Sequence, residues 1–452
     1  MKRQKRLTLL LAVLAVCIAV AFGLSQIDFE EKMTGTKTEI IHVDSSEITG
    51  LSWNYDGEVS FTCENEEWSY DGDEAMPVDQ ELLAEIAENL SNITSDKRVE
   101  EVKSLGLYGL DDPAYTVTVV ADKTYEISIG DESFTDGEVY ISAGDDYVYL
   151  TDAELIDEIA YSLYDLVEKE EIPEMESISS IQIEKAAPVK LVWEENSGYC
   201  YSDEYTYFLE DEDEYRNLDN EKAESTFDSL TAFVWEECVD YNAEDSELAA
   251  YGLDDPDAAV TADYKDADGE EQTFSYEIAE AGGIYYVRLA DSRMVYTVSQ
   301  DVYDAAVNAS YDELKPDEVI LLNWSDVDSI EIEMDGNSYT IEIERGEDEE
   351  YTCIYEGTEV DFSDVLDSLS GITAAEDPEE GIALGDGNSE IILTIHRRAE
   401  KASDVELAFY QYDGTYCIPV LDGEELDPVN REDVVSLKEA VNAIILDTGR
   451  GE

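Results

Sequence analysis

The sequence predicts an α+β protein of three related units of antiparallel β-hairpins with a few helices, preceded by one transmembrane helix. Three observations lead to this prediction. A six-residue motif occurs twice, apolar residues alternate with polar ones between its copies, and an uncharged apolar run stands near the N-terminus. Alternating runs that follow one another as hairpins, with few helical segments among them, are typical of antiparallel sheets.

The N-terminal segment has the pattern of a membrane anchor. Four basic residues lead into residues 7–24, LTLLLAVLAVCIAVAFGL, which carry no charge. A helix of that length rises about 27 Å, close to the thickness of the hydrocarbon core of a bilayer. Basic residues hold their end of a span in the cytoplasm. We therefore expect residues 1–26 to form a cytoplasmic stub and an uncleaved single-pass anchor in the cell membrane, with an extracytoplasmic body.

Two other interpretations of this segment remain open. Ala19-Val20-Ala21 has the small-x-small pattern of a signal-peptide cleavage site, and cleavage there would remove the anchor. Cys17 follows Leu14-Ala15-Val16, which resembles a lipoprotein signal, although Val16 is bulkier than the small residue expected before a lipidated cysteine.

The chain is strongly acidic, with 113 Asp and Glu residues against 26 Lys and Arg and a net charge of −87. A field of that sign repels nucleic acid, so we exclude it as a partner. A solvated, aggregation-resistant surface is one interpretation of the acidity, and calcium binding is another. The nearest EF-hand-like run begins at Tyr264, with Gly269 at its centre and Ser275 at the twelfth position, which is a poor ligand set. We predict the tip of a β-hairpin there and expect no metal or cofactor.

An internal repeat determines the predicted domains. Each motif copy is preceded by a helix-like segment and followed by alternating strands, and a third copy has lost the motif. The predicted units are 40–173, 174–316 and a divergent 317–447, with Pro173 and Pro316 at the joins. The motif YGLDDP comprises Tyr108, Gly109, Leu110, Asp111, Asp112 and Pro113 in the first unit, and Tyr251, Gly252, Leu253, Asp254, Asp255 and Pro256 in the second.

The motif is predicted to form a corner between a helix and a strand. Gly109 permits a positive φ, and Pro113 favours an extended conformation for the residue before it. Tyr108 and Leu110 would pack beneath the turn. This structural role is favoured over a binding site.

The residues give no pattern of a catalytic or metal centre. Carboxylate pairs are uninformative in so acidic a chain, His42 and His396 lack zinc-site spacing, and no serine-nucleophile or nucleotide-binding motif is present. His396 stands beside Arg397 and Arg398, which favours either a strand-edge position or a small anion site. Five cysteines outside the anchor have no short spacing, so we predict isolated and mostly buried thiols: Cys63, Cys200, Cys238, Cys353 and Cys417.

Four evenly spaced tyrosines are the candidate partner-binding residues: Tyr199, Tyr201, Tyr205 and Tyr207. On a hairpin their rings would share one face and offer a platform for a sugar or a protein. The alternative is that tyrosine simply suits a half-buried strand.

The segments GLDDP at 109–113 and 252–256, with the anchor and the hairpin-rich units, resemble a bacterial family known as domain of unknown function 4340. The resemblance covers residues of about 40 to 310. It implies anchored extracytoplasmic proteins that accompany ABC-type transporters of gliding motility or export, and it carries no catalytic residues.

We therefore expect a non-catalytic accessory or scaffold protein that binds the membrane through its N-terminal helix and has an ABC transporter permease as its partner. A cell-surface module that binds carbohydrate or polymer through tyrosine-rich β faces is the alternative function, and a carboxylate hydrolase is a third. The sequence makes no prediction of oligomeric state.

Overall fold

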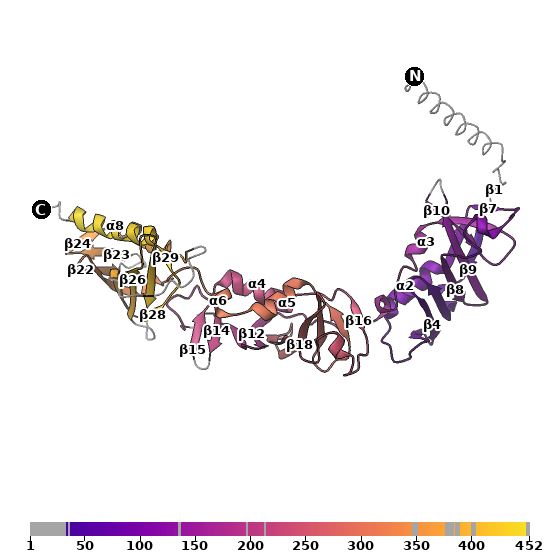
Figure 1. The fold of residues 1–452 in the computed structure, drawn as a ribbon, viewed down its shortest axis with the longest axis horizontal. Helices are drawn as coiled ribbons and strands as arrows, with labels where there is room; N and C mark the ends of the chain where they lie inside the picture. The colour runs from indigo at the N-terminus through magenta and orange to yellow at the C-terminus, as the bar shows by residue number, and fades with distance from the viewer. Residues whose placement is uncertain are drawn as a thin grey trace, which may run out of the picture. The chain divides into compact units, whose positions relative to one another are not determined.

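The computed structural model (Figure 1) describes residues 33–34, 37–133, 137–195, 198–211, 214–345, 351–375, 384, 389–398 and 404–448. The chain divides into two compact units. Unit 1 comprises Met1–Glu171, Glu237–Glu244 and Arg293–Tyr296, and unit 2 comprises Ile172–Glu236, Asp245–Ser292 and Thr297–Glu452. Unit 1 contains one large sheet, the first sheet, and unit 2 contains most of the second sheet and the third sheet.

The first sheet has the strand order β1-β7-β11-β10-β9-β8-β3-β4-β5. Alternation along β8 and β9 turns Val117, Val119, Ile127 and Ile129 into the core. The carboxylate of Asp79 caps α2. The bounds are β1 (Met33–Thr34), β3 (Gly50–Asn54), β4 (Glu58–Glu64), β5 (Glu67–Tyr70), β7 (Lys97–Val99), β8 (Tyr115–Val120), β9 (Thr124–Glu132), β10 (Glu138–Ser142), β11 (Val148–Asp152), α2 (Gln80–Leu90), α3 (Glu154–Asp157), η1 (Ser45–Glu47), η2 (Leu105–Leu107) and η3 (Tyr164–Leu166), with a separate pair β2 (Thr38–His42) and β6 (Asn92–Ser95).

Within unit 2, seven strands of the second sheet follow the order β15-β14-β13-β12-β17-β18-β19. Helices α4 and α5 contact each other and the strands beneath them. The Nζ atom of Lys185 caps the C-terminal end of α5, because it donates hydrogen bonds to the carbonyls of Val307 at 2.8 Å and Ala309 at 2.6 Å. The bounds are β12 (Ser177–Glu184), β13 (Val189–Trp193), β14 (Tyr207–Asp211), β15 (Glu214–Asn217), β17 (Ala258–Lys265), β18 (Glu271–Ala281), β19 (Ile284–Leu289), α4 (Asn220–Thr231), α5 (Gln300–Asn308), α6 (Tyr311–Leu314) and η4 (Leu248–Ala250). Strand β16 (Cys238–Asp240) pairs with β20 (Val295–Thr297) at residues that belong to unit 1.

The third sheet has the order β24-β23-β22-β21-β25-β26-β27-β28, and β29 also pairs with β27. Helices α7 and α8 pack against each other. Glu390 on β25 fixes α8, because its carboxylate lies 2.7 Å from both Arg431 and Lys438. The bounds are β21 (Val327–Met334), β22 (Asn337–Arg345), β23 (Tyr351–Tyr355), β24 (Thr358–Val360), β25 (Ser389–Arg397), β26 (Asp404–Gln411), β27 (Tyr416–Leu421), β28 (Glu424–Glu425), β29 (Val429–Asn430), α7 (Ser363–Ser370), α8 (Arg431–Thr448) and η5 (Trp324–Asp326).

The three sheets share one strand order in their central part. It runs β9-β8-β3-β4-β5 in the first sheet, β18-β17-β12-β13-β14 in the second and β26-β25-β21-β22-β23 in the third. The link between two equivalent strands differs in length. Residues Asn65 and Glu66 join β4 to β5, whereas 194–206 join β13 to β14. The second sheet therefore carries a loop that the first lacks.

The α+β prediction is confirmed. The alternating apolar and polar residues that follow the first motif copy form the strands β8 and β9, as expected. The helix-like segment before the first motif copy, residues 78–94, is only partly helical, because α2 ends at Leu90 and Asn92–Ser95 pair with β2. The predicted anchor, residues 1–26, lies outside the described residues, among which no helix is long and apolar enough to cross a membrane. The ranges 40–173, 174–316 and 317–447 stay a prediction of related units.

Candidate functional site: a cavity between the second and third sheets

Both copies of YGLDDP follow a 3-10 turn and precede a strand. The amide of Leu110 donates to the carbonyl of Leu105 at 3.1 Å, and that of Leu253 donates to Leu248 at 3.0 Å. The ring of Tyr108 lies 5.0 Å from that of Tyr140, and Tyr251 lies 5.1 Å from Tyr286. The two copies have the same local geometry.

Positive φ values at the motif glycines are confirmed, at +70° for Gly109 and +75° for Gly252. The first corner is the more crowded. A Cβ atom on Gly109 would lie 2.8 Å from the backbone nitrogen of Asp131, whereas one on Gly252 would lie 3.2 Å from the nearest atom, Cβ of Ala279. Leu110 and Leu253 are buried beneath the turns. These contacts give the motif a packing role at the start of β8 and β17.

The four candidate tyrosines do not share one strand face. Only Tyr207 belongs to a strand, β14, while the other three lie in the loop before it. Tyr199 stacks on Tyr215 with ring centroids 3.9 Å apart, and Tyr205 is 7% exposed. The even spacing suggested a hairpin, but the long link between β13 and β14 breaks the alternation.

We call residues 198–206 the docking loop, because they contact the third sheet within unit 2. The carbonyl of Tyr201 accepts hydrogen bonds from the amide of Asn323 and from Nη2 of Arg397, each at 3.0 Å. The Tyr201 hydroxyl donates to the carboxylate of Asp422, and its ring packs against the apolar core of the third sheet. The side chain of Arg397 is only 3% exposed. The candidate binding tyrosine Tyr201 thus contacts its own chain.

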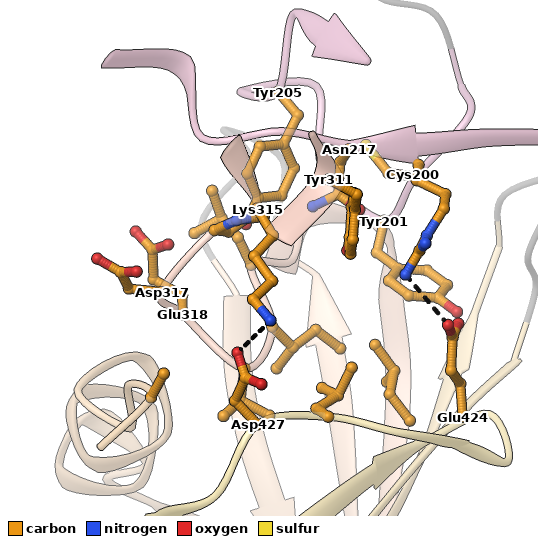
Figure 2. A pocket seen from close by; sticks show the side chains of 18 of the residues that line it. Cys200, Tyr201, Tyr205, Asn217, Tyr311, Lys315, Asp317, Glu318, Glu424 and Asp427 are labelled. Carbon is orange, nitrogen blue, oxygen red and sulfur yellow. Dashed lines mark hydrogen bonds and ion pairs between the residues drawn. The ribbon is translucent and has the colours of Figure 1, made fainter. Parts of the chain in front are cut away.

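A cavity of about 270 Å³ lies beside this contact. Figure 2 shows Tyr205, Tyr311 and Lys315 on one side of it, with Glu424 and Asp427 opposite. Apolar residues also line it: Val319, Ile320, Leu321, Leu421 and Leu426. The tyrosines come from the docking loop and α6, and the two acids come from the end of the third sheet. Both sheets of unit 2 are needed to form the cavity.

Ion pairs connect the two sides of the cavity. Nη2 of Arg216 lies 3.3 Å from Glu424, and Nζ of Lys315 lies 2.7 Å from Asp427 (Figure 2). The Arg216 guanidinium also lies 3.4 Å from the centre of the Tyr311 ring. Burial alone lowers the pKa of Lys315, but the hydrogen bonds that its ammonium group donates to Asp427 and Asp312 outweigh burial and raise that pKa above its ordinary value. Lys315 therefore stays a charged partner of these carboxylates.

The tyrosines of the cavity are neutral at physiological pH. Burial raises the pKa of Tyr205, and it also raises that of Tyr311 despite the opposing effect of Arg216. Burial likewise raises the pKa of the Cys200 thiol, and a protonated thiol is a weak nucleophile. The cavity thus offers ring faces, hydroxyl groups and paired charges, a combination suited to holding a ligand.

Neither His396 nor the EF-hand-like run that begins at Tyr264 forms a binding site in the structure. His396 does not lie at a sheet edge, because β25 pairs with both β21 and β26, so the strand-edge expectation is wrong. Its ring nitrogens face Glu331 at 3.7 Å and Asp404 at 3.2 Å, which disfavours an anion there. The predicted hairpin tip is confirmed, since β17 and β18 pair up to Lys265 and Glu271. The described residues hold no group of three or more acidic, His or Cys side chains that could bind a metal ion.

All five predicted thiols are free cysteines in the structure. Cys238, Cys353 and Cys417 are buried and Cys63 and Cys200 are half-buried, which agrees with the prediction of mostly buried thiols. Burial raises the pKa of Cys238 and that of Cys417 to about 11.

The sequence reasoning missed the basic residues that line the cavity. Arg216 and Lys315 stand apart in the chain, and no motif connects them. One signal was available: with 26 basic residues in 452, each base in the acidic body is a candidate for a specific contact. Their carboxylate partners lie on the other sheet of unit 2. Local sequence patterns do not predict which parts of two sheets come into contact.

Comparison with known proteins gives one family. No curated protein matches the chain. The family model described as Domain of unknown function (DUF4340) matches residues 68–233 and, overlapping them, 209–378. The first match runs from β5 to just past α4, and the second runs from β14 to just past α7. Together they cover more than half of the chain. The chain therefore belongs to the DUF4340 family.

Proposed function

We propose that this chain is a non-catalytic accessory or scaffold protein of an ABC-type exporter, anchored in the cell membrane with its body outside the cytoplasm. In this proposal residues 1–26 are the uncleaved anchor, and the body consists of three related units. The charge pattern of residues 2–24 and the family's implied association with transporters support it.

The observation that carries the scaffold role is the contact within unit 2. The docking loop and Arg397 join the second and third sheets through hydrogen bonds and apolar packing. A joined pair of sheets presents surfaces at a fixed spacing, which suits a protein that positions a partner. Raised thiol pKa values and paired bases favour this role over chemistry at the cavity.

The partner surface in the membrane is proposed to be a stripe of small residues. In a helix over 7–24, Ala12, Ala15, Ala19 and Gly23 lie on one face, and small residues let transmembrane helices approach closely. Ala21 lies on the opposite face. Replacing it by leucine adds the same bulk away from the stripe, so it is the matched control.

The test is purification of the full chain from its native membrane in mild detergent, followed by identification of what co-purifies. We expect an ABC permease with the wild type and with Ala21→Leu, and much less of it with the double change Ala15→Leu and Ala19→Leu. Isolation of a lone protein, with residues 40–447 alone restoring function in a deletion strain, would refute the proposal.

A further inference from the structure

The cavity of unit 2 has features of a ligand site that neither the family nor the scaffold role assigns. We propose that it binds a small organic cation, a guanidinium or ammonium group on an apolar stem. The cation is placed between the Tyr311 ring and the Glu424 carboxylate, where the Arg216 side chain now lies. Arg216 is then an internal competitor of the ligand.

The charge of the lining selects the sign of the ligand. Two lining residues are basic, Arg216 and Lys315, and both are already paired with carboxylates. Six lining residues are acidic: Asp312, Asp317, Glu318, Glu424, Glu425 and Asp427. An anion would be repelled by the excess of carboxylates in the lining and by the field of a chain with net charge −87. A cation is attracted by both.

The aromatic walls favour an organic cation over a metal ion. Cations bind the faces of aromatic rings, most strongly where water is excluded. The structure shows this contact twice beside the cavity: Arg216 lies 3.4 Å from the Tyr311 ring centre, and Arg397 lies 5.6 Å from that of Tyr201. The apolar part of the lining, which includes Val319 and Leu426, matches an alkyl stem, which a metal ion lacks.

The ion pair between Arg216 and Glu424 at the rim of the cavity is exposed and can be replaced by a ligand. Arg216 and Glu424 are 40% and 68% exposed, and their atoms are 3.3 Å apart. Exposed ion pairs of this kind contribute little to stability, so a ligand cation can replace Arg216 at small cost. A volume of about 270 Å³ is at the lower limit for ligand pockets, which restricts the occupant to a small molecule.

The test is calorimetric titration of the full-length chain in mild detergent at physiological salt with n-butylguanidinium, and with n-butylurea as its uncharged isostere. We expect one site for n-butylguanidinium and no binding of n-butylurea. Tyr311→Leu and Glu424→Gln should each weaken binding about tenfold, and Tyr311→Phe should retain it because the ring remains. Removing the competitor by Arg216→Met should tighten binding about tenfold.

Matched controls separate this site from loose attraction to an acidic surface. Arg398→Met makes the same charge change as Arg216→Met on a side chain outside the cavity, and Glu356→Gln matches Glu424→Gln. Both controls should leave the affinity unchanged. Equal effects of Arg216→Met and Arg398→Met, or equal binding of n-butylurea, would overturn the proposal, and so would many weak sites with no response to Tyr311→Leu.

Discussion

The buried guanidinium of Arg397 donates a hydrogen bond to the main-chain carbonyl of Tyr201, 196 residues earlier in the chain, at 3.0 Å. The same arginine lies 3.8 Å from the carboxylate of Asp326. A charge with 3% side-chain exposure is stable only when such partners surround it. The contact is therefore one of the links that join the second sheet to the third, and its donor is buried.

Replacing Arg397 should destabilise unit 2 strongly. Arg397→Met removes the donor to Tyr201 and leaves Asp326 without this partner, so we expect a loss of about 2–4 kcal/mol in the free energy of unfolding. Arg398→Met is the control, because that side chain is 51% exposed and should cost less than about 1 kcal/mol. Urea denaturation measures both, and equal losses would contradict a special role of Arg397.

The motif corner predicts an order of glycine sensitivity. Gly109→Ala combines left-handed backbone strain with a contact of 2.8 Å to the Asp131 backbone and should cost about 2–4 kcal/mol. Gly252→Ala meets its nearest atom at 3.2 Å and should cost less. Gly144→Ala has φ of +78° with nothing within 4 Å and isolates the strain alone, about 1–2 kcal/mol. Thermal unfolding of the three variants tests this order, and a Gly144 variant as damaged as the Gly109 variant would refute the crowding argument.

The Glu390 carboxylate predicts an acid-dependent loss of stability. Hydrogen bonding from Lys438, with a smaller effect from Arg431, lowers the pKa of Glu390 below its ordinary value of 4.5. A carboxyl group with a lowered folded-state pKa stabilises the fold above the unfolded-state pKa, and this contribution is lost as the pH falls through the folded-state value. Glu390→Gln should therefore cost about 1–3 kcal/mol at neutral pH and much less in strong acid.

Urea midpoints of wild type and Glu390→Gln, measured from pH 7 downward, check this prediction. The gap between them should be constant above pH 4.5 and close below it. Glu356→Gln, a change at an exposed turn, should show no gap at any pH. A gap for Glu390→Gln that persists in strong acid would show that its charge is not the cause.

The local structure was largely predictable because it follows from local patterns. Alternation at Val117 and Val119 predicts β8, and the glycine of the motif predicts a positive φ that the structure confirms. The docking loop was not predictable, because evenly spaced tyrosines in a loop have the same sequence signal as a strand. The cavity was not predictable either, since Arg216 and Glu424 are 208 residues apart and meet through tertiary packing.

The long link between β13 and β14 makes the copies of this duplicated architecture unequal. Sheets that share one strand order could in principle exchange places in the sequence without a change in their own topology. The docking loop ends that freedom, because Tyr201 fits a surface that includes Arg397 and Asp422 of the next sheet. Transplanting the two-residue turn Asn65-Glu66 into the second sheet would remove the contacts of Tyr201 with the third sheet. The second sheet thus differs from the first in this loop, while the central strand order of the two sheets is the same.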